Sequence, residues 1–162
     1  MPLTTKGIGY QTGLTAVAEY ASRLDGLERT ALAVWAADCA EHALSHFELK
    51  HPTDRRPRAA VEAARAWARG EIRMAEARRA AVAAHAAARN SDCPAARAAA
   101  RATGHAAGTA HMPGHAREAA AYAVTAAAAA VPPAGVDAAI ASERDWQIER
   151  LPTNRNPHSG SR

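Results

Sequence analysis

The sequence Thr103-Gly-His-Ala-Ala-Gly-Thr-Ala-His-Met-Pro-Gly-His115 has the pattern expected where one alanine-rich helix ends and the next begins. Proline disfavours the helical conformation at Met112, which precedes it, and Gly114 follows at once. The stretch also holds three of the eight histidines of the chain, namely His105, His111 and His115. It therefore predicts a corner between two helices, with histidines on both sides of the break.

Two glycines precede this corner. Gly104 and Gly108 stand four residues apart, which is about one turn of a helix. On a helix, this spacing favours the close approach of another backbone.

Alanine supplies most of the apolar composition. Apolar residues make up 48% of the chain, but aromatic residues only 4%. Alanine is the best helix former, and its small side chain lets helices pack closely. We therefore expect an all-α fold, a bundle of about six or seven short alanine-rich helices. With 162 residues, the chain is long enough for one domain with a core and too short for two ordinary ones.

Glycine and proline clusters divide the chain into these helices. The breaks fall at Asp25-Gly26, His51–Asp54, Gly70, Asn90–Pro94, Met112–Gly114 and Pro132–Gly135. Between them we expect helices over about residues 12–24, 27–50, 57–70, 72–90, 94–112, 115–131 and 136–151. Residues 1–11 are expected to form an irregular lead-in to a single domain over 1–151, and 152–162 a disordered tail.

The apolar segments are short. None reaches the roughly 20 apolar residues that a membrane span needs, and the first residues lack the apolar core of a signal peptide. We expect a cytoplasmic protein with no membrane partner. Two distant cysteines, Cys39 and Cys93, predict reduced thiols rather than a disulfide framework.

The net charge of +4, with a sequence pI of 9.6, is carried almost entirely by arginine. Many arginines stand beside glutamates at helical spacing, which is typical of a solvated surface. No basic run with interleaved aromatic residues is present, so nucleic-acid binding is not favoured. A basic protein suits an acidic partner surface. A homo-oligomer stays open, because alanine and glycine faces can pack between subunits as well as within one.

The histidines raise the question of a metal site. On a continuous helix, His111 and His115 would lie close enough to share an ion. A third ligand would come from His105, His85, His42, Asp38 or Glu41. Against this stand the break at Pro113-Gly114, the absence of a His-Glu-x-x-His motif, and the frequency with which histidines between helices only form hydrogen bonds. The metal question stays open, and no cofactor is predicted.

A cysteine nucleophile is the other chemical alternative. Cys39 precedes His42 by three residues, so the thiol and the imidazole can approach on a helix, with Asp38 or Glu41 orienting the ring. Cysteine in an alanine-rich helix is more typically a small buried apolar group. We therefore assign no catalytic residue.

A ligand pocket, if one forms, would be lined by the polar and aromatic side chains that interrupt the alanine faces. These candidates are Trp35, Asp38, His42, Arg65, Trp67, His85, His105, His111 and Tyr122.

Five short blocks occur in a fixed order along the chain. They are Trp35-Ala-Ala-Asp-Cys-Ala-Glu-His42, Asp54-Arg-Arg-Pro-Arg58, Ala63-Ala-Arg-Ala-Trp-Ala68, Ala84-His-Ala-Ala87, and Gly104-His-Ala with Ala110-His-Met112. Together they resemble the bacterial helical family of putative immunity proteins, over about residues 31–131. The resemblance implies an all-helical cytoplasmic protein, assigned by its association with toxin systems to neutralising a cognate toxin by binding it.

Two functions follow as hypotheses. The first is an immunity-type protein that confers self-resistance by binding a toxin or sequestering a harmful ligand. The alternative is a small helical enzyme or metal-binding protein that acts on a small molecule through an internal pocket of histidine, aspartate and tryptophan side chains.

Overall fold

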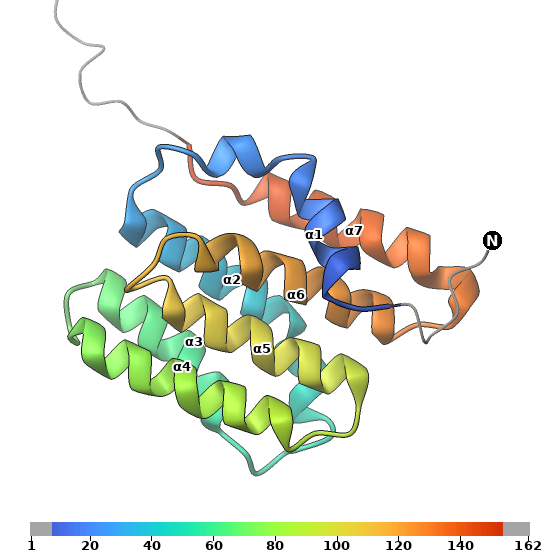
Figure 1. The fold of residues 1–162 in the computed structure, drawn as a ribbon, viewed down its shortest axis with the longest axis horizontal. Helices are drawn as coiled ribbons and strands as arrows, with labels where there is room; N and C mark the ends of the chain where they lie inside the picture. The colour runs from blue at the N-terminus through green and yellow to red at the C-terminus, as the bar shows by residue number, and fades with distance from the viewer. Residues whose placement is uncertain (1–7, 154–162) are drawn as a thin grey trace, which may run out of the picture.

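The computed structural model describes residues 8–153 (Figure 1). This part of the chain is all-α, as predicted, and contains seven α-helices, two short 3-10 helices and no strand. The elements are α1 (Tyr10–Ala18), η2 (Ala21–Leu24), α2 (Arg29–Glu48), α3 (Arg56–Ala68), α4 (Met74–Arg89), α5 (Pro94–Gly108), α6 (His115–Ala129), η3 (Pro133–Gly135) and α7 (Val136–Glu149).

Helix α5 occupies the centre of the bundle. It packs against α4 on one side and α6 on the other, and against α2 and α3, which lie behind it in the view of Figure 1. Helices α1 and α7 pack against α6. Most residues of α5 are buried, whereas α4 lies at an edge of the bundle and exposes one of its sides.

Small side chains build the core. Alanines from α2 to α6 are almost completely buried, and the few large buried groups include Trp35, Phe47, Leu44, Val61 and Val124. Because alanine projects only a methyl group, the helices can approach closely and leave little room for an extended cavity. Polar side chains that reach into such a core are therefore held tightly by their neighbours.

The predicted breaks fall close to the observed helix ends. Gly26 and Gly70 adopt positive φ angles of 76° and 74°, which favour glycine and end the helical path. Pro57 and Pro94 lie in the first turns of α3 and α5, where proline has no hydrogen bond to lose. The corner after Met112 is also observed, since α5 ends at Gly108 and α6 begins at His115.

The structure corrects the prediction at the amino-terminal side. Helix α1 begins at Tyr10, inside the expected irregular lead-in, and ends at Ala18 rather than continuing to residue 24. Tyr20 has a non-helical backbone, with φ −127° and ψ 4°, so a separate 3-10 helix follows. The Tyr20 ring, in this break between the two helices, is buried, and its hydroxyl donates a hydrogen bond to the side chain of Gln147. Residues 1–7 and most of the predicted tail, 154–162, lie outside the described residues.

None of the helices in the described part of the chain combines the length and apolar character of a membrane span.

Candidate functional site

Three side chains meet at the corner between α5 and α6, and we call them the His–His–Glu cluster: His105, His115 and Glu118. The Nδ1 atoms of His105 and His115 are 2.9 Å apart. The Oε2 atom of Glu118 lies 2.8 Å from Nδ1 of His105 and 3.1 Å from Nδ1 of His115. Two imidazoles and a carboxylate therefore direct one atom each toward a common point.

The corner itself produces this convergence. His105 lies in the last turn of α5, and the chain turns through Pro113 and Gly114 before α6 begins at His115. Glu118 follows three residues later in the first turn of α6, on the same side of the helix as His115. Because α5 packs along α6, the end of one helix faces the start of the next.

Gly104 and Gly108 provide the space for two imidazole rings. A Cβ atom at Gly104 would lie 2.7 Å from the ring of His85, and one at Gly108 would lie 3.1 Å from the ring of His115. We expected this glycine pair to admit another backbone. Instead, α5 admits the side chains of His85 from α4 and His115 from α6.

A column of aromatic rings fixes the orientation of His105. The His105 ring stacks on Tyr122, with centroids 5.3 Å apart and planes 7° apart. Tyr122 in turn stacks on Tyr10 of α1 at 4.7 Å. Three helices thus restrict the rotation of the His105 ring and hold Nδ1 toward the cluster.

Burial keeps nearby imidazoles neutral. It lowers the pKa of His105 to about 3, with further lowering by His85, His115 and Arg101. Burial and the adjacent positive charge of Arg101 likewise lower the pKa of His85. At neutral pH, each of these rings carries one proton and keeps one nitrogen lone pair.

A cavity of about 220 Å³ adjoins the cluster. His85, His111 and His115 line it together with Arg78 and Val82. Among the described residues, the Nδ1 atom of His111 is the one buried side-chain nitrogen or oxygen without a hydrogen-bond partner. The pair proposed from the four-residue spacing, His111 and His115, has ring centroids 5.1 Å apart, but the His–His–Glu cluster contains only His115.

The structure places two of the candidate pocket residues elsewhere, against α7. The indole nitrogen of Trp35 donates a hydrogen bond to the carbonyl of Gln147 at 3.1 Å. Nδ1 of His42 lies 2.7 Å from the carboxylate of Glu143, and its ring stacks on Trp146. Trp35 and His42 thus belong to the contact between α2 and α7.

Three further candidates lie on α2 and α3. Arg65 donates hydrogen bonds to Asp38 at 2.8 Å and to Glu41 at 2.7 Å, and Trp67 is a half-buried residue near the end of α3. The nine candidates therefore fall into three groups, of which His85, His105, His111 and Tyr122 come together at the α5–α6 corner. Glu118 was not among them, although its position three residues after His115 is a signal visible in the sequence.

The structure argues against Cys39 as a nucleophile activated by His42. Cys39 is completely buried, and burial raises the pKa of its thiol well above the usual value, so the thiolate form is disfavoured. His42 directs Nδ1 to Glu143 instead. The structure therefore does not support Cys39 as a nucleophile.

The fold and the cluster define a helical bundle with a histidine-rich internal site. The chain belongs to the Imm-5 like putative immunity protein family, whose sequence profile matches residues 22–154. This membership was predicted from the five blocks and is confirmed, and the match extends beyond them to include α7. No curated protein and no solved structure matches the chain.

Proposed function

We propose that this protein neutralises a toxin by binding it directly, and that the exposed side of α4 forms the contact surface. The observation that carries the proposal is family membership over residues 22–154. An immunity protein of this kind needs an accessible surface complementary to its toxin rather than an extended internal pocket.

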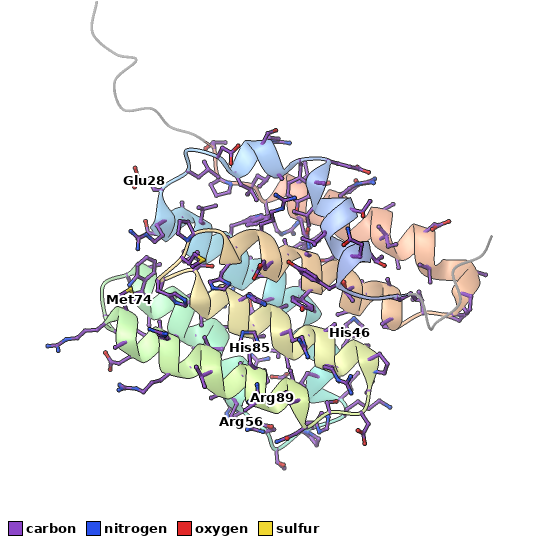
Figure 2. All side chains as sticks on the ribbon, in the orientation of Figure 1. Glu28, His46, Arg56, Met74, His85 and Arg89 are labelled. Carbon is purple, nitrogen blue, oxygen red and sulfur yellow. The ribbon has the colours of Figure 1, made fainter. Side chains whose placement is uncertain are left out.

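Exposed apolar side chains gather around α4. Met74 and Val82 of this helix are 49% and 61% exposed, and Met112, at the nearby α5–α6 corner, is 54% exposed. Figure 2 labels Met74, His85 and Arg89 along α4. His111, the neighbour of Met112, lines the same cavity as Val82, which links the corner to the helix. Methionine is enriched in protein interfaces, where its flexible side chain adapts to a partner.

The same side of α4 is basic. Arg73, Arg78, Arg79 and Arg89 are all exposed, whereas the single acidic residue of the helix is Glu76. The carboxylate of Glu76 accepts a hydrogen bond from the backbone of Arg73 and so serves the helix start. This charge favours a toxin surface that presents carboxylates around an apolar centre.

The proposal is tested by coexpression with candidate toxin polypeptides, followed by growth measurement and titration calorimetry of each purified pair. We expect the wild-type protein to restore growth and to form a stable complex. Val82→Asp and Arg79→Glu should each weaken binding at least about 10-fold, because they place a negative charge on the proposed contact surface.

Two control variants make the same types of substitution at exposed residues outside α4. Leu49→Asp alters an exposed apolar residue that follows α2, and Arg23→Glu alters an exposed arginine of η2. Both should bind as the wild type does. Loss of binding in the controls, or full binding by the α4 variants, would reject α4 as the contact surface. A toxin that neither binds the protein nor is neutralised by it would reject the proposed function.

The alternative function, action on a small molecule, draws support from one observation: three ligating atoms beside a cavity of about 220 Å³. Under this alternative, Glu118→Gln would abolish protection while Arg79→Glu, at a residue outside the cavity lining, would preserve it. The coexpression assay therefore separates the two functions with the same set of proteins.

A further inference from the structure

We propose that His105, His115 and Glu118 bind one divalent transition-metal ion. This site does not rest on the proposed toxin contact. Metal bonds to imidazole nitrogen and carboxylate oxygen are about 2.0–2.2 Å long, so two ligands on one ion lie about 3.4 Å apart at the tetrahedral angle usual for Zn²⁺ and about 3.0 Å apart at the right angles of a five- or six-coordinate ion. The three distances within the cluster are 2.9, 2.8 and 3.1 Å. The three atoms are therefore spaced as ligands on one side of a single ion.

With an ionised carboxylate, protons alone do not satisfy all three contacts of this arrangement. If both Nδ1 atoms of His105 and His115 carry hydrogen, two N–H groups face each other at 2.9 Å. If only His115 Nδ1 carries hydrogen, the lone pair of His105 faces the carboxylate at 2.8 Å. The reverse assignment leaves the lone pair of His115 facing the same oxygen at 3.1 Å. A cation at the centre attracts all three atoms and removes this conflict.

The donor set indicates the class of ion. Two histidines and one carboxylate bind Zn²⁺ in hydrolytic enzymes and Fe²⁺ in oxygenases, in both cases with coordination positions left open. Imidazole favours Zn, Cu, Fe and Ni over Mg and Ca. The site is thus suited to a first-row transition metal.

Access to the ion comes from solvent and from the adjoining cavity. The side chains of His105, His115 and Glu118 are 15%, 22% and 36% exposed, so an ion can reach them without unfolding the bundle. His111 also lines the cavity next to His115, and its Nδ1 atom is buried without a hydrogen-bond partner.

The surrounding residues preorganise the cluster. Tyr122 stacks on the ring of His105, and Gly108 leaves room for the ring of His115. A ligand set that is already in place binds an ion without the cost of ordering flexible side chains. The corner at Pro113-Gly114 is the local feature that brings these ligands together.

The test uses the full-length protein without an affinity tag, freed of metal by chelation. Titration with ZnCl₂ in a calorimeter should give one ion per chain, and Co²⁺ should give a visible d–d spectrum characteristic of nitrogen and oxygen ligands. Glu118→Gln and His115→Gln should each weaken Zn²⁺ binding more than about 10-fold, since even loss of a residue that only supports a ligand costs about that much. The matched controls Glu62→Gln and His46→Gln should bind as the wild type does.

Circular dichroism in the presence of chelator establishes that each variant folds. X-ray absorption of the wild-type zinc protein provides a readout that needs no variant, with two imidazole ligands and no sulfur expected. The proposal is overturned by absence of Zn²⁺, Co²⁺, Fe²⁺ and Ni²⁺ binding to the wild type, by stoichiometric binding that persists in both cluster variants, or by sulfur in the coordination shell.

Discussion

Gly104 of α5 lies directly against the imidazole of His85 from α4, since a Cβ atom at residue 104 would lie 2.7 Å from two atoms of that ring and 2.9 Å from a third. The ring is itself packed edge-on against His105, with centroids 4.8 Å apart. The absence of a side chain at one position thus determines where two histidines lie.

Gly104→Ala should therefore destabilise the bundle, although alanine is the better helix former. Inserting a methyl group into a packed contact costs about 1–3 kcal/mol, of which improved helix propensity returns up to about 1 kcal/mol. We expect a net loss of up to about 2 kcal/mol in the free energy of unfolding, measured with urea. Gly114→Ala is the matched control, because nothing lies within 4 Å of its added Cβ, and it should be neutral or stabilising. Equal stability of the two variants would show that the His85 ring moves aside freely.

Glycines show which features of this fold the sequence predicts and which it does not. Breaks such as Gly70 and Pro113-Gly114 act on the local backbone, so the helix ends could be predicted within a few residues. At Gly104 we expected the backbone of another helix, but the ring of His85 fills the space. Which of the two lies there depends on the helix that packs against α5, and the sequence does not identify that helix. An alanine-rich helix carries little information about its neighbours, since its faces resemble one another.

For the polar residues, too, the sequence predicts local features but not long-range partners. His105 and His115 could be selected as candidates, since both flank a predicted corner. Glu143 and Gln147 could not be assigned to His42 and Tyr20, which lie more than a hundred residues earlier in the chain. Such partners are set by the packing of α7 on the rest of the bundle, which periodicity does not predict.

The buried amide of Gln147 should be coupled energetically to Tyr20. Its Oε1 accepts a short hydrogen bond from the Tyr20 hydroxyl, and its Nε2 donates to the carbonyl of Ala120 at 3.0 Å. Gln147→Met removes these two bonds and a third, from Nε2 to Glu143 Oε1 at 3.2 Å, and leaves buried polar atoms unpaired, which should cost about 2–4 kcal/mol of unfolding free energy. Tyr20→Phe should cost much less in the Gln147→Met background than in the wild type.

Urea unfolding of the four proteins in this cycle measures the coupling, expected to be about 1 kcal/mol or more. Additive costs would mean that the hydroxyl and the amide contribute independently, contrary to the contact observed in the structure.

Glu143 should make stability depend on pH. This carboxyl is 6% exposed, and burial raises its pKa above the usual value of about 4.3, although His42, Gln147 and Arg150 act in the opposite direction. Because the folded state then binds the proton more tightly than the unfolded state, the contribution of Glu143 to stability is greatest below the unfolded pKa. That contribution is lost as the pH rises through the folded pKa.

Glu143→Gln does not titrate, so its stability relative to the wild type should increase between pH 4 and pH 7. Chemical unfolding of both proteins at a series of pH values gives this difference directly. Two groups that face the carboxyl, Tyr20 and Cys39, are unchanged in the comparison. Glu149→Gln, at an exposed residue of the same helix, should show no such trend. A constant difference between wild type and Glu143→Gln would mean that His42 and Arg150 fully offset the burial.

The two cysteines should differ sharply in reactivity. Cys39 is completely buried and its pKa is raised by burial, whereas Cys93 is half-buried at the start of α5. Thiol reagents attack the accessible thiolate, so Cys93 should be modified in the native protein and Cys39 only after unfolding. In Cys93→Ser, a disulfide reagent should release no chromophore under native conditions and one equivalent in denaturant. Rapid labelling of Cys39 in the native protein would show that the core around α2 opens readily. It would also return Cys39 to consideration as a nucleophile beside His42.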